Sequence, residues 1–440
     1  MSETKTRIYV GLSFLAGILL TLGFKDVYPD LERRYQRSRN RVGSIFDRLR
    51  PPGRNVELKD ATDPHAHDVQ PTDYPEGIES TIGNTPIFKI KSLSEATGCT
   101  ILAKAEFLNG AGNSPKDRVA LNIVSRAESA GLLTPHSGDT VYEGTVGSTG
   151  ISLATICRAR GYHAHICIPS DQSPEKTNLL LALGATVSPV PPAPIVDTNQ
   201  FVNLARRLAA EHTADPARPG RGLFADQFES EANWHAHFAG TGPEILSQTG
   251  GKLDAFVSGA GTGGTISGVA LFLKPRVKGL KVVLADPQGS GLFNRVRYGV
   301  MFDAKEREGT RRRHQVDTIV EGIGINRVTR NFEVGRELVD DAVRVSDEQA
   351  LAMARWLVEK DGIFIGSSSS VNCVAATQVA LQMGPGHTIV TLLCDSGARH
   401  LSKFWAKAGV VADASGTSLD EVLNAVPRTA PSLSPPTSHT

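Results

Sequence analysis

The sequence predicts an α/β protein of two lobes with mostly parallel sheets, and three observations support this fold class. The chain has 440 residues, of which 40% are hydrophobic, so it can bury more than one core. Short apolar segments alternate with segments of helical pattern between about residues 75 and 412. Glycine-rich loops follow the apolar segments, at the strand ends where parallel sheets bind ligands.

The repeating units run in order along the chain. Residues 140–143 are an expected strand, followed by the loop GTVGSTG and a helix from Ile151. The strands HAHICIPS and ATVSPV come next, with the helix SPEKTNLLLALG between them. Residues 254–273 (DAFVSGAGTGGTISGVALFL) repeat strand, glycine loop and helix, and KVVLADP, GIFIGSSSSVNCVAATQVAL and TIVTLLCDSGARHL continue the pattern. Such alternation predicts parallel strands with helices on both faces.

The overall composition excludes several classes of function. Lys plus Arg number 47 and Asp plus Glu number 46, so the charge balance gives no reason to expect a nucleic-acid partner. The five cysteines are odd in number, scattered, and free of metal-ligand spacing. We therefore expect free thiols in a reducing compartment and no metal site.

The N-terminal region is expected to lie outside the enzyme core. Residues 8–24 (IYVGLSFLAGILLTLGF) are uncharged and are flanked by Lys5, Arg7 and Lys25. This pattern predicts a retained membrane anchor within residues 1–25, with a cleaved signal peptide or a buried helix as alternatives. The positive charge that follows favours a catalytic part facing the cytosol, and a short anchor with basic flanks suits the mitochondrial outer membrane.

The remaining domain boundaries follow from composition. Residues 26–74 are expected to form a linker rich in arginine and proline, and residues 413–440 a disordered tail with one short helix near SLDEVLNAV. Between them we expect an N-terminal lobe over 75–230 and a C-terminal lobe over 231–412. The basic segment 293–315 could be a lid, a partner surface or a solvated insertion.

A glycine-rich loop at residues 259–268 (GAGTGGTISG) predicts a phosphate site. Glycines allow a ligand to approach the backbone, and the helix that follows offers free amides of partial positive charge. Thr262 and Thr265 add hydroxyl donors. Two alternatives remain: a tight turn without a ligand, and a dinucleotide site, because Gly259, Gly261 and Gly264 satisfy GxGxxG with Asp286 about twenty residues further on.

Lys116 stands between a loop of small residues and an expected helix. A cation at a helix N-terminus is disfavoured by the helix dipole, which lowers its pKa. A partly desolvated, neutral lysine amine forms Schiff bases with aldehydes. Together with a phosphate site, this amine predicts a phosphorylated aldehyde cofactor, pyridoxal phosphate. A solvated lysine paired with Asp117 is the alternative for the segment taken alone.

At this point the sequence resembles the cysteine synthase and cystathionine β-synthase branch of the fold-type II pyridoxal-phosphate enzymes, over roughly residues 75–412. The ordered motifs that carry the resemblance are GNSPKDR, EGTVGSTG, SPEKTNLLLALGATV, ADQFESEANWHAHFAGTGPEI, GAGTGGT, VEGIGIN, GSSSSVN and CDSGARHLS. With the expected anchor, the chain looks like a membrane-anchored cysteine synthase of the fungal type. The resemblance implies a tryptophan synthase β-like fold and a homodimer.

The resemblance also implies roles for individual residues. Lys116 is the Schiff-base lysine and the catalytic base, and Ser368 faces the pyridine nitrogen. The implied phosphate cup comprises Gly261, Thr262, Gly263, Gly264 and Thr265, and Ser148 stands where the family has an asparagine against the cofactor ring. The implied substrate-binding residues are Thr145, Gly147, Thr149 and Gln227. The implied reaction is β-replacement, in which O-acetyl-L-serine and hydrogen sulfide give L-cysteine and acetate.

Two departures from the family pattern leave other activities open. The usual loop reads Thr-Ser-Gly-Asn-Thr-Gly, whereas this chain has Val146 and Ser148 at its second and fourth positions. Each lost charge-assisted hydrogen bond could cost about 1.5–3 kcal/mol. The alternatives are a cysteine desulfhydrase, a cystathionine synthase, a serine dehydratase, or a degenerate scaffold that only binds the cofactor. No Cys-Pro-x-Cys haem motif is present.

Overall fold

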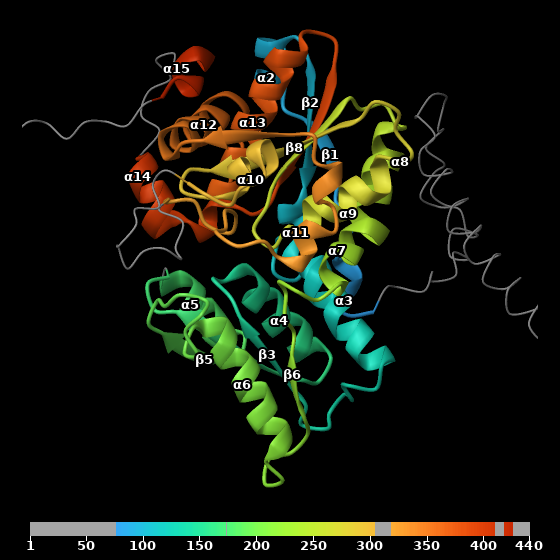
Figure 1. Cartoon of the computed structure of the whole chain (residues 1–440), viewed down its shortest axis with the longest axis vertical. Coiled ribbons are helices and arrows are strands. Elements are labelled where there is room, and N and C mark those ends of the chain that lie inside the picture. The colour runs from blue at the N-terminus through green and yellow to red at the C-terminus, as the bar shows by residue number, and fades with distance from the viewer. Residues whose placement is uncertain (1–75, 173, 304–317, 410–417, 426–440) are drawn as a thin grey trace, which may run out of the picture. The chain divides into compact units, whose positions relative to one another are not determined.

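Two twisted sheets organise the protein in a computed structural model that describes residues 76–172, 174–303, 318–409 and 418–425 (Figure 1). The larger sheet has six strands in the order β1 (Ile87–Lys89), β2 (Thr100–Ala105), β10 (Thr388–Leu393), β7 (Ala255–Gly259), β8 (Lys281–Pro287) and β9 (Asp341–Val345). All its strand pairs are parallel except β1 with β2. The smaller sheet is parallel throughout, in the order β5 (Thr186–Val190), β4 (His163–Pro169), β3 (Thr140–Gly144) and β6 (Gly222–Phe224).

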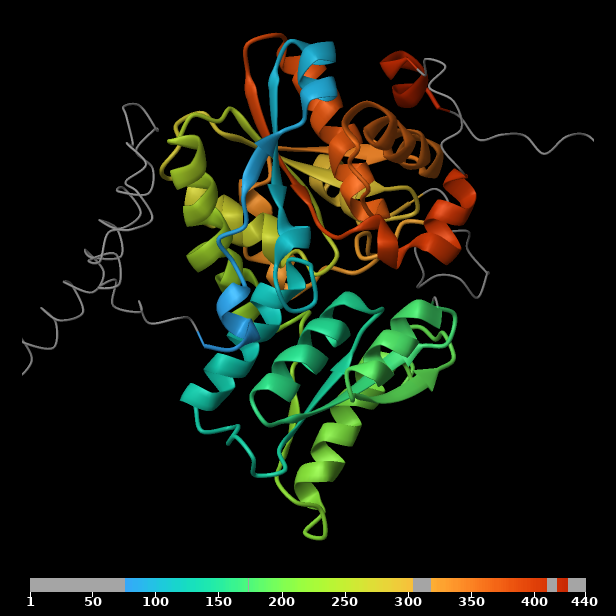
Figure 2. The same cartoon turned by 180° about the vertical axis from the view of Figure 1, so that it is seen from behind.

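Helices cover both faces of each sheet (Figures 1 and 2). One core of the larger sheet is completed by α2 (Lys91–Thr97), α12 (Asp347–Asp361) and α13 (Ser367–Met383). The other is completed by α8 (Gly242–Thr249), α9 (Gly264–Leu273), α10 (Leu292–Tyr298) and α11 (Arg330–Glu333). The smaller sheet packs on α3 (Lys116–Ser129), α4 (Ser148–Ala159), α5 (Pro174–Ala182) and α7 (Ala232–Ala236) on one side and on α6 (Phe201–Ala214) on the other.

The central strands are continuous apolar runs because both faces are buried. Every residue of β3 and of β7 is buried, as expected for parallel strands covered by helices on each side. Local signals set the helix starts: Ser346 and Gln349 form a reciprocal capping box at α12, and Gln200 accepts from the Val202 amide at α6. The sequence therefore specifies these elements locally.

The chain begins in the larger sheet, continues through the smaller sheet and then returns to the larger one. The strands β1 and β2 precede the smaller sheet in sequence, yet they pair within the larger sheet, next to β10. Residues 75–230 consequently contribute to both sheets. The C-terminal part carries the short helix α15 (Leu419–Leu423), which has its own capping box at Ser418 and buries Val422.

The expected transmembrane helix requires a correction of the fold class and of the localisation. Among the described residues, no helix is long and apolar enough to cross a membrane. Residues 8–24, where the anchor was expected, lie outside the described part. The fold class of the described residues is thus α/β with no membrane-spanning helix, and neither the anchor nor the mitochondrial outer membrane is retained. The linker, residues 304–317 and most of the tail also lie outside the description.

Candidate active site

A cavity of about 440 Å³ collects the loops that the sequence analysis singled out. Its lining comes from the carboxyl ends of strands in both sheets, including Thr145 after β3, Gln227 after β6, Gly261 after β7 and Cys394 after β10. Parallel α/β sheets bind ligands at this edge because loops and helix N-termini converge there. The cavity is therefore the place to examine each expected site residue.

Lys116 is the first residue of α3 and lines this cavity. Burial lowers the pKa of its amine, and the negative charge of Asp395 only partly opposes that effect. Among the described residues, no hydrogen bond or ion pair holds its Nζ. In contrast, the neighbouring Asp117 accepts from the Gly112 amide at 2.7 Å and from the Ser152 hydroxyl at 2.5 Å, and so does not pair with Lys116. An amine with a lowered pKa and no hydrogen-bond partner among the described residues is available to react.

The glycine loop between β7 and α9 forms a cradle of backbone. Gly263 has a left-handed φ of 83°. A Cβ at Gly261, Gly263 or Gly264 would collide with Gly322, Phe332 or Asn233, respectively. The loop therefore requires glycine, and its free amides at the start of α9 can hold a phosphate.

Two threonines complete that cradle. The Thr262 hydroxyl accepts from Asn233 Nδ2 at 2.8 Å, which leaves its proton free for a ligand. Thr265 Oγ1 lies 3.2 Å from His237 Nε2. Four of the five expected phosphate residues line the cavity, and Gly264 supports the loop from behind.

The four serines at the start of α13 have different partners. Ser367 Oγ accepts from the Glu321 amide, Ser369 Oγ accepts from the Cys394 amide, and Ser370 donates to the Gly366 carbonyl. Ser368 is the one that lines the cavity, where it hydrogen-bonds with the Cys394 thiol. The structure thereby separates Ser368 from its neighbours, which the sequence could not do.

The loop between β3 and α4 brings the expected substrate residues together. Thr145, Val146, Ser148 and Thr149 line the cavity, while Gly147 supplies a φ of 142° that places its backbone against Lys176. The Thr149 hydroxyl donates to Gln227 Oε1 at 2.5 Å. The start of α4 thus faces the same space as Lys116.

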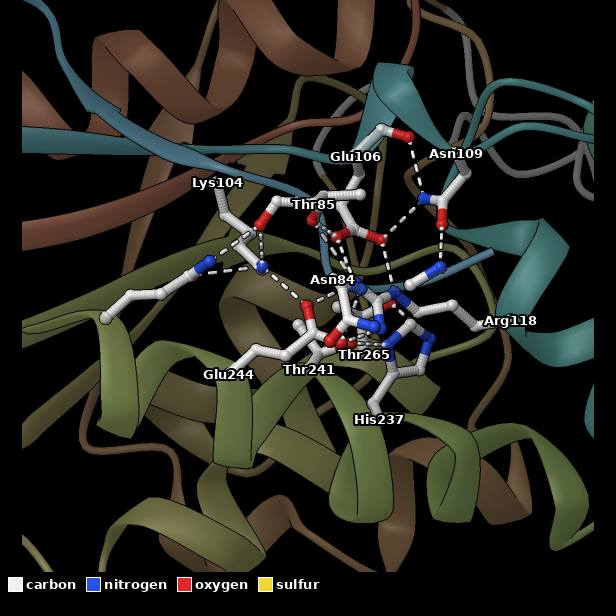
Figure 3. A network of polar contacts seen from close by, with 12 residues as sticks. Asn84, Thr85, Lys104, Glu106, Asn109, Arg118, His237, Thr241, Glu244 and Thr265 are labelled. Atoms are coloured by element: carbon white, nitrogen blue, oxygen red, sulfur yellow. Dashed lines mark hydrogen bonds and ion pairs between the residues drawn. The ribbon is translucent and has the colours of Figure 1, made fainter. Parts of the chain in front are cut away.

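A buried network of charges anchors the helix that carries Lys116 (Figure 3). Arg118 makes a two-pronged contact with Glu106, with both distances 2.8 Å, and another with Glu244 at 2.6 and 2.7 Å. Lys104 Nζ lies 2.6 Å from Glu244. Burial alone would raise the pKa of Glu106, but the Arg118 guanidinium lowers it to about 2. The two cations, Arg118 and Lys104, are therefore paired with the two anions, Glu106 and Glu244, in the interior.

His237 lies beside this network and contacts the phosphate cradle through Thr265 (Figure 3). Its Nδ1 lies 2.9 Å from Thr241 Oγ1 and its Nε2 contacts Thr265. Burial lowers the pKa of His237 to about 3, so the ring is neutral. The sequence analysis missed this network. The signal available for it was a pair of charged residues at the end of an apolar run, Lys104 within β2 and Glu106 directly after the strand.

A second cluster of charges, also missed, lines the cavity on its other side. Glu321 lies 2.7 Å from Lys176 and 3.3 Å from Lys403. His400 Nε2 lies 3.0 Å from Asp395, and its Nδ1 lies 3.3 Å from Glu321. Burial alone would lower the pKa of His400, but the two carboxylates raise it to about 9. These residues stand in the motifs SPEKTN, VEGIGIN and CDSGARHLS.

The donor set fits pyridoxal phosphate and does not fit a dinucleotide. A lysine amine with a lowered pKa, a glycine cradle for phosphate and a serine hydroxyl at a helix N-terminus surround one cavity. Asp286, which the dinucleotide alternative needs for a ribose, is fully buried, and its carboxylate accepts from the Phe293 amide at 2.7 Å. It is thus engaged by the protein itself.

Comparisons with known proteins agree with this reading. Residues 78–395 match the family described as pyridoxal-phosphate dependent enzymes. Cysteine synthase 2 of Emericella nidulans is 65% identical over 96% of this chain and 98% of its own length, and that of Neurospora crassa is 62% identical over 90% and 91%. A crystal structure of O-ureido-L-serine synthase has 30% identity and a TM-score of 0.65, covering 80% of this chain and 99% of its own. The resemblance inferred from the motifs is confirmed, and the chain belongs to the cysteine synthases among the pyridoxal-phosphate-dependent enzymes.

Proposed function

We propose that this protein forms L-cysteine and acetate from O-acetyl-L-serine and hydrogen sulfide. The observation that carries the proposal is the convergence on one cavity of the buried Lys116 amine, whose pKa is lowered, and the phosphate cradle. The similarity to two proteins named Cysteine synthase 2 supports the same reaction. In this reaction the Cβ–O bond breaks, a C–S bond forms, and the proton lost from Cα is returned.

The residues of this chain divide the work among them. The bound cofactor supplies an electron sink for the charge that develops at Cα. The Lys116 amine accepts the Cα proton and later returns it, which requires the neutral form that burial favours by lowering the pKa. Ser368 offers its hydroxyl to the pyridine nitrogen, and Thr262 and Thr265 hold the phosphate with the amides at the start of α9.

The substrate carboxylate is assigned to the first turn of α4. The first amides of a helix have no partner within the helix, so they are free to bind an anion. Thr145, Ser148 and Thr149 flank that position in the cavity. A homodimer, which the resemblance implies, is part of the proposal and is tested by sedimentation of the purified protein.

The test uses the protein reconstituted with pyridoxal phosphate. Borohydride reduction should fix the cofactor to one peptide, containing Lys116, and product analysis should detect cysteine and acetate in equal amounts. Lys116→Ala should abolish the attachment and lower turnover at least about 100-fold. Lys252→Ala, at an exposed lysine, is the control and should leave both unchanged. Undiminished cysteine formation by Lys116→Ala would refute the proposal.

A further inference from the structure

We propose that Asn372 is a positioning residue that sets the distance between the two ends of the cofactor site. The inference deepens the proposed function, and it rests on the assignment there of Ser368 to the pyridine nitrogen and of the glycine loop after β7 to the phosphate. Asn372 has no solvent exposure and does not line the cavity. It has had no role so far beyond closing the motif GSSSSVN.

Asn372 lies on the same side of α13 as Ser368. The two residues are four positions apart in this helix, and residues at that spacing share one helix face. The helix α13 packs on β7 and β10. The face that brings Ser368 to the cavity therefore also brings Asn372 to the two strands.

The side-chain amide of Asn372 bridges the ends of β7 and β10. The pairing of these strands ends at Val257 and Thr391. Just beyond that point, Asn372 Oδ1 accepts from the Gly259 amide at 2.7 Å, and Nδ2 donates to the Leu392 carbonyl at 2.9 Å. The orientation of the side-chain amide is fixed, because one backbone group can only donate and the other can only accept. Asn372 thus links the two strands where their pairing ends.

Both linked strands continue directly into the cofactor site. Gly259 is the last residue of β7 and the first of the glycine loop that forms the phosphate cradle. Leu392 lies two residues before Cys394, whose thiol hydrogen-bonds with Ser368. Asn372 Nδ2 also lies 3.7 Å from Cys394 Sγ. One buried side chain therefore contacts the element at each end of the site.

The distance between the two ends matters because one ligand must reach both. The ring nitrogen and the phosphate of pyridoxal phosphate are held at a nearly fixed separation. A ligand that occupies two subsites at once binds more tightly than its fragments only if the subsites match its own geometry. Asn372 therefore controls how much tighter the whole cofactor binds than its parts.

Each half of the site is held locally by contacts that do not involve Asn372. In the cradle, Asn233 Nδ2 donates to Thr262 Oγ1 at 2.8 Å, and the Thr329 hydroxyl donates to the Thr262 carbonyl at 2.7 Å. Ser368 lies in the first turn of α13. Loss of the Asn372 amide should thus change the separation of the two halves and leave each half intact.

The test compares the whole cofactor with its two fragments. The full chain is freed of cofactor, and its binding of pyridoxal phosphate, pyridoxal and inorganic phosphate is measured by titration calorimetry. Asn372→Ala should weaken the binding of pyridoxal phosphate at least about tenfold and that of each fragment less than about twofold. Binding needs no turnover, so a failure to form cysteine would refute the proposed function without affecting this result.

Thr377→Val is the matched control. Thr377 is also fully buried on α13, but its hydroxyl donates to the Cys373 carbonyl of the same helix at 2.8 Å. Thr377→Val should bind all three ligands as wild type does. Unchanged binding of pyridoxal phosphate by Asn372→Ala, or an equal weakening of the whole cofactor and its fragments, would overturn the proposal.

A milder variant covers the case in which Asn372→Ala fails to fold. Asn372→Ser keeps a polar side chain that is too short to bridge both strands. It should show the same selective effect to a smaller extent, with pyridoxal phosphate bound about fivefold more weakly and the fragments unchanged. Wild-type affinity for pyridoxal phosphate in Asn372→Ser, or fragments weakened as much as the whole cofactor, would equally overturn the proposal.

Discussion

Replacing Glu106 with glutamine should destabilise the protein by roughly 3 kcal/mol at pH 7. The substitution keeps the shape of the side chain but removes the charge that faces Arg118. The arginine would remain 5% exposed, with its guanidinium short of one counter-charge. A buried charge that loses a partner is costly because water cannot replace that partner.

The magnitude follows from the electrostatics of the site. The pKa of Glu106 is lowered from 4.5 to about 2. Each pKa unit corresponds to about 1.4 kcal/mol of free energy, so the ionised form contributes roughly 3 kcal/mol to folding. Because the pKa is lower in the folded state, this contribution is present above pH 4.5 and is lost as the pH falls toward 2.

Urea unfolding followed by tryptophan fluorescence measures the difference between wild type and Glu106→Gln. The gap should be largest at pH 7 and should narrow between pH 4.5 and 3. Glu231→Gln is the matched control, because Glu231 pairs with Arg330 at 51% and 66% exposure and should cost under about 1 kcal/mol. A gap below about 1 kcal/mol for Glu106→Gln at pH 7, or one that stays constant down to pH 3, would refute the reasoning.

Two further predictions concern the cavity. Ser148→Asn places the longer amide side chain at the first position of α4 and should lower the KM for O-acetylserine by about tenfold in steady-state kinetics. An unchanged KM would mean that the shorter serine side chain does not weaken substrate binding. His400→Gln removes an imidazolium whose pKa is raised to about 9 by Asp395 and Glu321. The imidazolium stabilises the folded state fully below pH 6.5, and this stabilisation is lost as the pH rises through 9. In urea titrations, the free energy of unfolding of wild type should therefore fall by roughly 3 kcal/mol over this interval, and that of His400→Gln should fall much less.

The elements that the sequence predicted best are the buried parallel strands. The strands β3, β7, β8 and β10 stand where the apolar runs occur, because strands covered on both faces need continuous hydrophobicity. Strand pairing was not predictable in the same way. The strand β10 lies between β2 and β7, an order set by contacts between residues almost 300 positions apart, which no local pattern encodes.

In the candidate site, too, the features encoded by short motifs were predictable, and those that depend on distant contacts were not. Lys116 and the phosphate cradle were found because each depends on a short contiguous motif. The choice of Ser368 among four serines and the contacts of Gln227 with Thr149 and Glu143 depend on which atoms meet in three dimensions. The Arg118 network is a still clearer case, since Glu244 joins it from 126 residues away.

Buried charged groups around the cavity occur in two kinds of environment: the Arg118 network pairs cations with anions, whereas Glu143 accepts hydrogen bonds from Gln227. Beneath Lys116, cations and anions are matched one to one, so the network adds rigidity without imposing a strong field on the amine. The lowered pKa of Lys116 accordingly comes from burial, with Asp395 opposing it. Next to Gln227, Glu143 has no matching cation among the described residues, and burial raises the pKa of its carboxyl to about 8. A charge-balanced support leaves burial as the main cause of the lowered pKa of Lys116, whereas the unmatched acid Glu143 has its own pKa raised by burial.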